Sequence, residues 1–231
     1  MGATKIMIIR HAEKPGSYNG QAYDGVNATG TQAGTEGAEH LVTLGWQRAG
    51  ALVTLFAKPW GPKNPDLATP QFLFASKPTK DDDNSSEHNS DDHQPSQRPY
   101  ETLIPLASAL GSNSQAMAIN LSYSKKQYDE MIADTLSCNG TVLICWQHED
   151  IPLLNDKGKP GLSQCILTQT QTQSGVLNIP TSWPKGPNGA RYDLVWIFDR
   201  PSGTGPITHF ALFAQCLLAG DSPAPSSSLS N

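Results

Sequence analysis

Long apolar runs are absent from this sequence of 231 residues, and this absence limits what the protein can be. No stretch approaches the roughly 20 consecutive apolar residues that a helix needs to cross a bilayer. The first strand-like run, residues 5–9, has no segment before it that reads as a signal peptide. We therefore expect a cytoplasmic protein that does not use a membrane as a partner.

Charged residues are also scarce, at 16% of the chain, and their balance is acidic, with a formal net charge of −5 at pH 7. Proteins that bind nucleic acids usually carry a basic patch or stripe, often with aromatic residues between the charges. The sequence contains no such stripe. Nucleic acid is therefore not expected as a partner.

Cysteine is sparse and irregularly placed: the four cysteines are Cys138, Cys145, Cys165 and Cys216. Cys145 and His148 form one C-x-x-H pair, but zinc sites usually need a second pair of ligands. We therefore expect free thiols and no metal. Cys145 and Cys216 fall in strand-like apolar runs, where cysteine behaves as a small buried hydrophobe.

What the sequence does contain is an alternation of strand-like and helix-like segments. This order favours an α/β fold, a three-layer sandwich in which a mostly parallel sheet has helices on both faces. Two later apolar runs flank a Gly/Pro-rich loop and predict a C-terminal antiparallel hairpin. The predicted strands are 5–9, 71–75, 116–121, 141–146, 192–198 and 207–215, and the predicted helices are 44–57, 99–110 and 123–137.

The organisation predicted from composition is one domain over residues 1–220. Residues 16–40 are rich in glycine and predict a surface loop. Residues 221–231 are rich in Ser and Pro and predict a disordered tail. An acidic loop insertion spans 79–97, with six acids and two histidines in 80–93. We expect a solvated loop, and the alternative is an adventitious cation site. Because the loop joins Ser76 to Arg98, it would lie beside any site that these two residues form and would disfavour polyanions there.

The most informative motif is Arg10-His11, directly after the strand-like run 5–9. In open α/β sheets, ligands bind at the carboxyl edge of the strands. An arginine there can hold a phosphoryl group through its fork of donors while a histidine nitrogen attacks phosphorus. The alternative is an ordinary surface strand that ends in two polar residues.

Three further residues follow predicted strands or begin a predicted helix. Ser76 comes after strand 71–75, Arg98 begins the helix-like stretch, and His148 comes after strand 141–146. Two of them have a simpler interpretation: Arg98 could start a helix and pair with Glu101 on the surface, and His148 could be a structural histidine. Their order and strand context favour a shared site.

Together these motifs resemble those of the histidine phosphatase superfamily, which has the phosphoglycerate mutase-like fold. The chain departs from the usual pattern at Ala12, where glycine is common, and in the long insertion before Arg98. No acidic residue of the middle region matches the proton donor of many phosphoglycerate mutases. The matching segments are Arg10-His11-Ala12-Glu13, Leu44-Gly45-Trp46-Gln47-Arg48-Ala49, Ser76, Arg98-Pro99-Tyr100-Glu101-Thr102 and His148.

The resemblance implies a phosphomonoester hydrolase that forms a phosphohistidine on His11. Its substrate would be a small phosphorylated metabolite or peptide. Arg10, Arg98 and His148 would neutralise the phosphoryl oxygens, so that neither a metal nor a cofactor is required. Lys14 and Lys77 are candidate substrate contacts.

The residue after the second histidine is the proton donor in the acid phosphatase branch, which implies this role for Glu149. We expect its carboxyl to be pushed toward the protonated state, with Asp150 as the alternative donor or a helix cap. Other activities fit the same motifs: a phosphoryl-transferring mutase or isomerase, or a phosphate-binding fold without hydrolase activity. The sequence predicts neither the particular substrate nor the oligomeric state.

Overall fold

The protein is built around a six-stranded mixed sheet with strand order β10-β9-β1-β6-β4-β5. The computed structural model describes residues 2–18, 21–30, 38–59, 61–78, 96–173, 175–186 and 189–223. β1, β6, β4 and β5 are parallel, whereas β9 runs antiparallel to both β1 and β10. The strands are β1 (Ala3–Arg10), β4 (Phe72–Ala75), β5 (Ile119–Asn120), β6 (Gly140–Trp146), β9 (Leu194–Asp199) and β10 (His209–Ala214).

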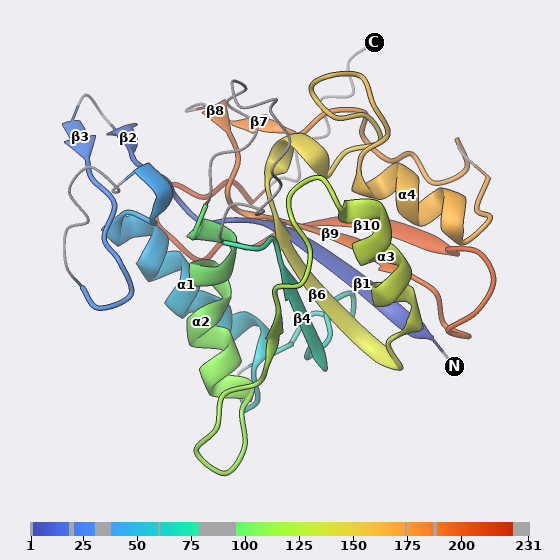
Figure 1. Ribbon diagram of the computed structural model, residues 1–231, viewed down its shortest axis with the longest axis horizontal. Helices are drawn as coiled ribbons and strands as arrows, with labels where there is room; N and C mark the ends of the chain where they lie inside the picture. Colours follow the sequence, from blue (N-terminus) through green and yellow to red (C-terminus); the bar gives the residue numbers. More distant parts are fainter. Residues whose placement is uncertain are drawn as a thin grey trace, which may run out of the picture.

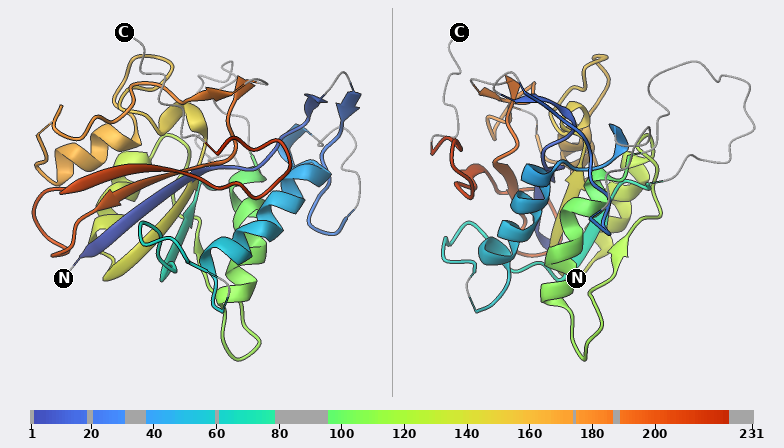
Figure 2. Two further views of the ribbon diagram at one scale, coloured as in Figure 1. Left: turned by 180° about the vertical axis from the view of Figure 1, so that it is seen from behind. Right: turned by 90° about the vertical axis from the view of Figure 1, so that its left-hand side faces the viewer.

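Helices cover both faces of this sheet (Figure 1). α1 (Thr43–Phe56) and α2 (Arg98–Leu110) pack on one face. α3 (Tyr128–Ser137) and α4 (Leu162–Gln169) pack on the other. The three-layer α/β fold predicted from the sequence is therefore confirmed, as is the C-terminal antiparallel hairpin, β9 and β10, which lies beside β1 (Figure 2).

The central strand β1 explains why this part of the sequence is continuously apolar. Ile6 and Ile8 face α3 and α4, whereas Met7 and Ile9 face α1 and α2, and all four side chains are fully buried. Successive side chains of a strand point to opposite faces, so a strand covered on both faces needs an apolar residue at every position.

The boundaries of several elements differ from the predictions. α3 begins at Tyr128 rather than at residue 123, because residues 124–127 form a turn in which the Gln127 N–H donates to the Ser124 carbonyl. α4 was not predicted, since its eight residues are too few to show a helical period clearly. Two short hairpins were also not predicted. One, β2 (Gly16–Tyr18) with β3 (Gln21–Tyr23), lies inside the expected loop 16–40. The other pairs β7 (Lys185–Gly186) with β8 (Gly189–Ala190).

The C-terminal segment is held more firmly than the sequence predicts. Asp221, the first residue of the predicted tail, forms an ion pair with the buried Arg48 of α1 at 2.7 Å. The sequence prediction of a disordered tail from residue 221 did not include this contact, because composition cannot show the distant partner. Residues 224–231 of that tail, and 79–95 of the acidic insertion, lie outside the described residues.

Two remaining predictions concern cysteines and membranes. Cys145 is buried in β6 as predicted, but Cys216 is exposed because it follows the end of β10. All four cysteines are free thiols. Among the residues that the structure describes, no helix is long and apolar enough to cross a membrane.

Candidate active site

The parallel strands deliver the predicted site residues to one edge of the sheet. The register pairs Arg10 of β1 with Trp146 of β6, and the His11 N–H donates to the Trp146 carbonyl at 3.0 Å. β4 ends beside β6 at Ala75, so that Ser76 follows at the same edge. Arg10, His11, Ser76 and the residues after Trp146 therefore meet at the carboxyl edge of the strands, where α/β proteins bind ligands.

His11 is held in a defined orientation and tautomer. Its side chain is buried, and Nδ1 lies 2.7 Å from the carbonyl oxygen of Ala12. Because a carbonyl oxygen only accepts, Nδ1 carries the proton and Nε2 carries the lone pair. Burial lowers the pKa of His11 well below its usual value, and the charges of Arg10, Arg98 and His148 lower it further. The imidazole is therefore neutral at pH 7.

Arg10 is fixed by residues that the sequence did not indicate. Its Nη1 donates to the Arg191 carbonyl at 3.3 Å, and its guanidinium carbon lies 3.7 Å from the centre of the Tyr192 ring. The same ring centre lies 6.1 Å from that of His11. Tyr192 just precedes β9, whose start lies at this edge because β9 is antiparallel to β1. The sequence shows the strand, but not that it pairs with β1.

Arg98, at the start of α2, adds a second guanidinium to the site. Its Nε donates to Ser96 Oγ and its Nη1 to the Ala38 carbonyl, each at 3.0 Å. Burial lowers the pKa of Arg98. Partial burial also lowers the pKa of Lys14, and the charges of Arg98 and Arg10 lower it further. These cations therefore repel one another, and a bound anion would relieve that repulsion.

The second predicted histidine belongs to a 3-10 helix, His148–Asp150, directly after β6. Nδ1 of His148 lies 2.9 Å from Oε2 of Glu149, and its ring stands edge-on to Trp183 at 6.3 Å. His11 and His148 follow the paired strands β1 and β6, and the charge of His148 is among those that lower the pKa of His11.

The expected upward pKa shift of Glu149 is contradicted. Burial raises the pKa of Glu149, but the contact with His148 and the charge of Arg10 outweigh burial and bring it to about 2. The pKa of the neighbouring Asp150 carboxyl is instead raised, to about 6, because this carboxyl is buried and lies next to the charge of Glu149. Without a bound phosphate, Glu149 is therefore ionised at neutral pH.

The loop after β1, which carries His11, is held by hydrogen bonds to both α1 and α2. The Ala12 N–H donates to Thr102 Oγ1 of α2 at 2.9 Å. The buried carboxylate of Glu13 accepts from Arg48 of α1, with Nη2 at 2.7 Å and Nε at 2.9 Å. Thr102 and Glu13 therefore position the loop.

The simpler interpretation of Arg98 as a surface partner of Glu101 does not fit the structure. The buried carboxylate of Glu101 instead contacts His40 Nδ1 at 2.5 Å and accepts from the Leu41 N–H at 2.9 Å. Lys77 follows β4, and its backbone N–H donates to the Tyr123 carbonyl at 2.7 Å. Lys77 is not among the charges that most affect His11, so its role as a substrate contact stays a prediction.

Within the described ranges, no group of three or more His, Cys, Asp or Glu side chains is arranged to hold a metal ion. Comparison of the chain with known protein families and with curated proteins finds no match. What the site can do must therefore be argued from its own residues: a neutral, oriented imidazole, two arginines, a second histidine and an adjacent carboxylate.

Proposed function

We propose that this protein is a phosphomonoester hydrolase that transfers the phosphoryl group of its substrate to Nε2 of His11 and then to water. The observation that carries the proposal is the hydrogen bond from Nδ1 of His11 to the Ala12 carbonyl, at 2.7 Å. It leaves the lone pair on Nε2 of a neutral imidazole, which is the form that can attack phosphorus.

The charges around His11 suit a phosphoryl group. Arg10 and Arg98 offer planar sets of N–H donors that match phosphoryl oxygens, and His148 adds a third donor when it is protonated. The stacking of Arg10 on Tyr192 fixes the guanidinium before substrate binds. Donors that are already in place stabilise the charge of the transition state without further reorganisation.

In the first step, the bond from Nε2 to phosphorus forms while the ester P–O bond breaks. Glu149 gives its proton to the leaving oxygen, and the alcohol departs. In the second step, Glu149 takes a proton from water, the oxygen of that water attacks phosphorus, and the N–P bond breaks. The products are the alcohol and inorganic phosphate, and His11 returns to its neutral form.

Glu149 must be protonated in the first step, although its pKa is about 2 in the free protein. A phosphate dianion bound beside it would raise that pKa, because like charge disfavours the carboxylate. Asp150 has the higher pKa, about 6, but its charge acts on Lys125 and Tyr128, whereas the charge of Glu149 acts on Arg98 and Lys14. We therefore propose Glu149 as the donor.

Release of inorganic phosphate from phenyl phosphate, followed for the wild-type protein and for His11→Ala, tests the hydrolase. We expect turnover by the wild type and none by the variant. Phosphorylation of His11 without release of phosphate would instead support a mutase. Phosphate binding with neither event would support a phosphate-binding fold. A small phosphorylated substrate and a cytoplasmic location remain part of the proposal.

A further inference from the structure

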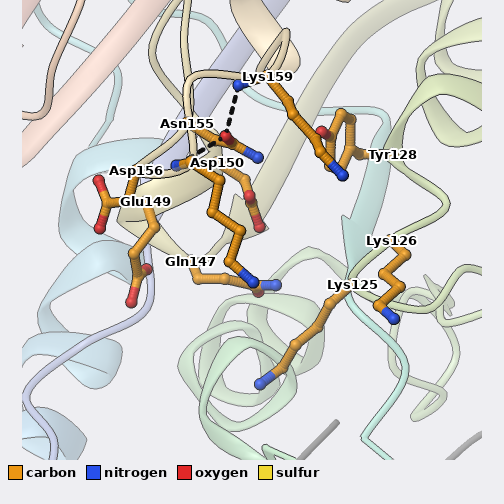
Figure 3. Close-up of a pocket in the computed structure, with 10 residues that line it drawn as sticks. Lys125, Lys126, Tyr128, Gln147, Glu149, Asp150, Asn155, Asp156 and Lys159 are labelled. Atoms are coloured by element: carbon orange, nitrogen blue, oxygen red, sulfur yellow. Dashed lines mark hydrogen bonds between the residues drawn. The ribbon is translucent and has the colours of Figure 1, made fainter. Parts of the chain in front are cut away.

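A pocket of about 650 Å³ opens beside the 3-10 helix that carries His148 and Glu149. Its size falls within the range of roughly 300–1,000 Å³ that is usual for small-molecule sites. Side chains from three separate segments surround it (Figure 3). The residues that line it include Lys125, Lys126, Glu149, Asp150, Lys157 and Lys159.

Glu149 and Lys125 connect this pocket with the proposed site of phosphoryl transfer. Glu149 lines the pocket, and its charge also acts on Arg98 and Lys14. Lys125 is half-buried, and burial together with the charge of Arg98 lowers its pKa. Since Glu149 is the proposed proton donor, the pocket lies on the side toward which the leaving group departs.

The pocket has a cationic character that the whole chain does not share. Four lysines and three carboxylates line it, while the formal net charge of the chain is −5. One of these carboxylates, Asp150, is partly neutralised near pH 6 because burial and the charge of Glu149 raise its pKa. The pocket therefore favours anions more than the protein surface does.

One wall of the pocket is a loop with its own hydrogen bonds. Oδ1 of Asn155 accepts from the backbone N–H groups of Lys157 and Lys159, at 3.0 and 2.9 Å (Figure 3). The Tyr128 hydroxyl donates to the Pro160 carbonyl at 2.8 Å, which ties this loop to the start of α3. The backbone that presents Lys157 and Lys159 is therefore fixed before a ligand binds.

We propose that this lysine pocket, formed around Lys125, Lys126, Lys157 and Lys159, binds a second anionic group on the leaving side of the substrate. The preferred substrates are then small phosphomonoesters whose alcohol carries a carboxylate or a second phosphate. This proposal rests on the proposed function. It names the class of substrate on which that function acts.

The test compares 4-carboxyphenyl phosphate with 4-carbamoylphenyl phosphate, which has nearly the same shape but no second charge. We expect kcat/KM to be about tenfold higher for the carboxylate, a difference that one charge-assisted contact can supply. A third ester, 1,4-phenylene bisphosphate, shows whether a second phosphate is preferred over a carboxylate. Equal kcat/KM for the charged esters and the carbamoyl ester would overturn the proposal.

The double variant Lys157→Gln/Lys159→Gln should reduce this preference to about twofold or less. The matched control is Lys58→Gln/Lys63→Gln, which removes the same total charge from two exposed lysines that do not line the pocket. The control should keep the wild-type ratio. An equal loss in both double variants would show that net charge, rather than the pocket, sets the preference.

Binding to His11→Ala separates the failure of this proposal from the failure of the proposed function. Calorimetry with the same two esters needs no turnover, so it tests the lysine pocket even if the wild type hydrolyses nothing. We expect about tenfold tighter binding of the carboxylate ester, and a weaker preference at high salt because ions screen the lysines. Equal affinities would overturn the lysine pocket, whatever the protein catalyses.

Discussion

Replacing Asp221 by Asn should destabilise the protein, because its carboxylate closes a buried network around Arg48. Nη1 and Nη2 of Arg48 donate to the two oxygens of Asp221 at 3.0 and 2.7 Å. The Arg48 and Asp221 side chains are only 4% and 7% exposed. Oδ2 of Asp221 also accepts from the backbone N–H groups of Leu217 and Leu218.

The size of the effect follows from what the variant retains. Breaking a buried ion pair costs about 3–5 kcal/mol when one charge is left unpaired. Arg48 keeps Glu13 as a partner, and Asn still accepts from the backbone, so we expect the lower end, about 3 kcal/mol. In a protein of this length each kcal/mol moves Tm by roughly 2–4 °C, which gives a fall of about 6–12 °C.

The loss should also depend on pH. Burial raises the pKa of Asp221, but the hydrogen bonds from Arg48 and the backbone outweigh burial, and the pKa lies below its ordinary value. Because the pKa is depressed by folding, the ionised carboxylate stabilises the folded state at pH values above the pKa of the unfolded chain, which is about 4. This stabilisation is lost as the pH falls through the lower pKa of the folded state. The difference in Tm between wild type and variant should therefore be full at pH 7 and smaller at pH 3.

Thermal unfolding at both pH values provides the measurement, with Asp24→Asn, at an exposed aspartate, as the matched control. A Tm for Asp221→Asn within 2 °C of the control, where the ion pair predicts a loss of about 6 °C or more, would refute the reasoning.

Three further predictions concern the site itself. Glu149→Gln should lower kcat/KM for an alkyl phosphate by roughly two to four orders of magnitude but barely change kcat/KM for 4-nitrophenyl phosphate, because this quantity reports the first step and the nitrophenolate needs no proton; equal losses of kcat/KM on both esters would rule out proton donation. Asp150→Asn removes a negative charge from the lysine pocket and should raise the preference for 4-carboxyphenyl over 4-carbamoylphenyl phosphate about two- to fivefold, as kcat/KM ratios will show. Tyr192→Leu removes the ring beneath Arg10 and should weaken inorganic phosphate binding by about tenfold in calorimetry, whereas Tyr192→Phe keeps the ring and should stay within twofold.

The sheet could be predicted from the sequence because its signals are local. Residues 6–9 are apolar at every position, and the structure shows helices on both sides of this strand. The pairing of β9 with β1 depends on contacts between residues 186 to 194 positions apart, and no local pattern encodes it. The position of Tyr192 under Arg10 follows from that pairing, so the sequence alone did not reveal it.

The candidate site, too, could be predicted from the sequence only in part. Strand order brings Arg10, His11 and His148 to one edge, as the positions of their strands predicted. The pKa of Glu149 went the opposite way from the prediction, since it depends on the exact distance to His148 and on the nearby charge of Arg10. The lysine pocket was not predicted, because Lys157 and Lys159 belong to an irregular loop without a recognisable motif.

The central claim is that His11 carries the phosphoryl group during turnover. Rapid acid-free quenching of the wild-type protein with a ³²P-labelled ester, followed by peptide mapping, tests it most directly. We predict a label on His11 that is stable in base and lost in acid, and that is absent from His11→Ala. Unlabelled His11 in a protein that hydrolyses the ester, or full activity of His11→Ala, would contradict the account.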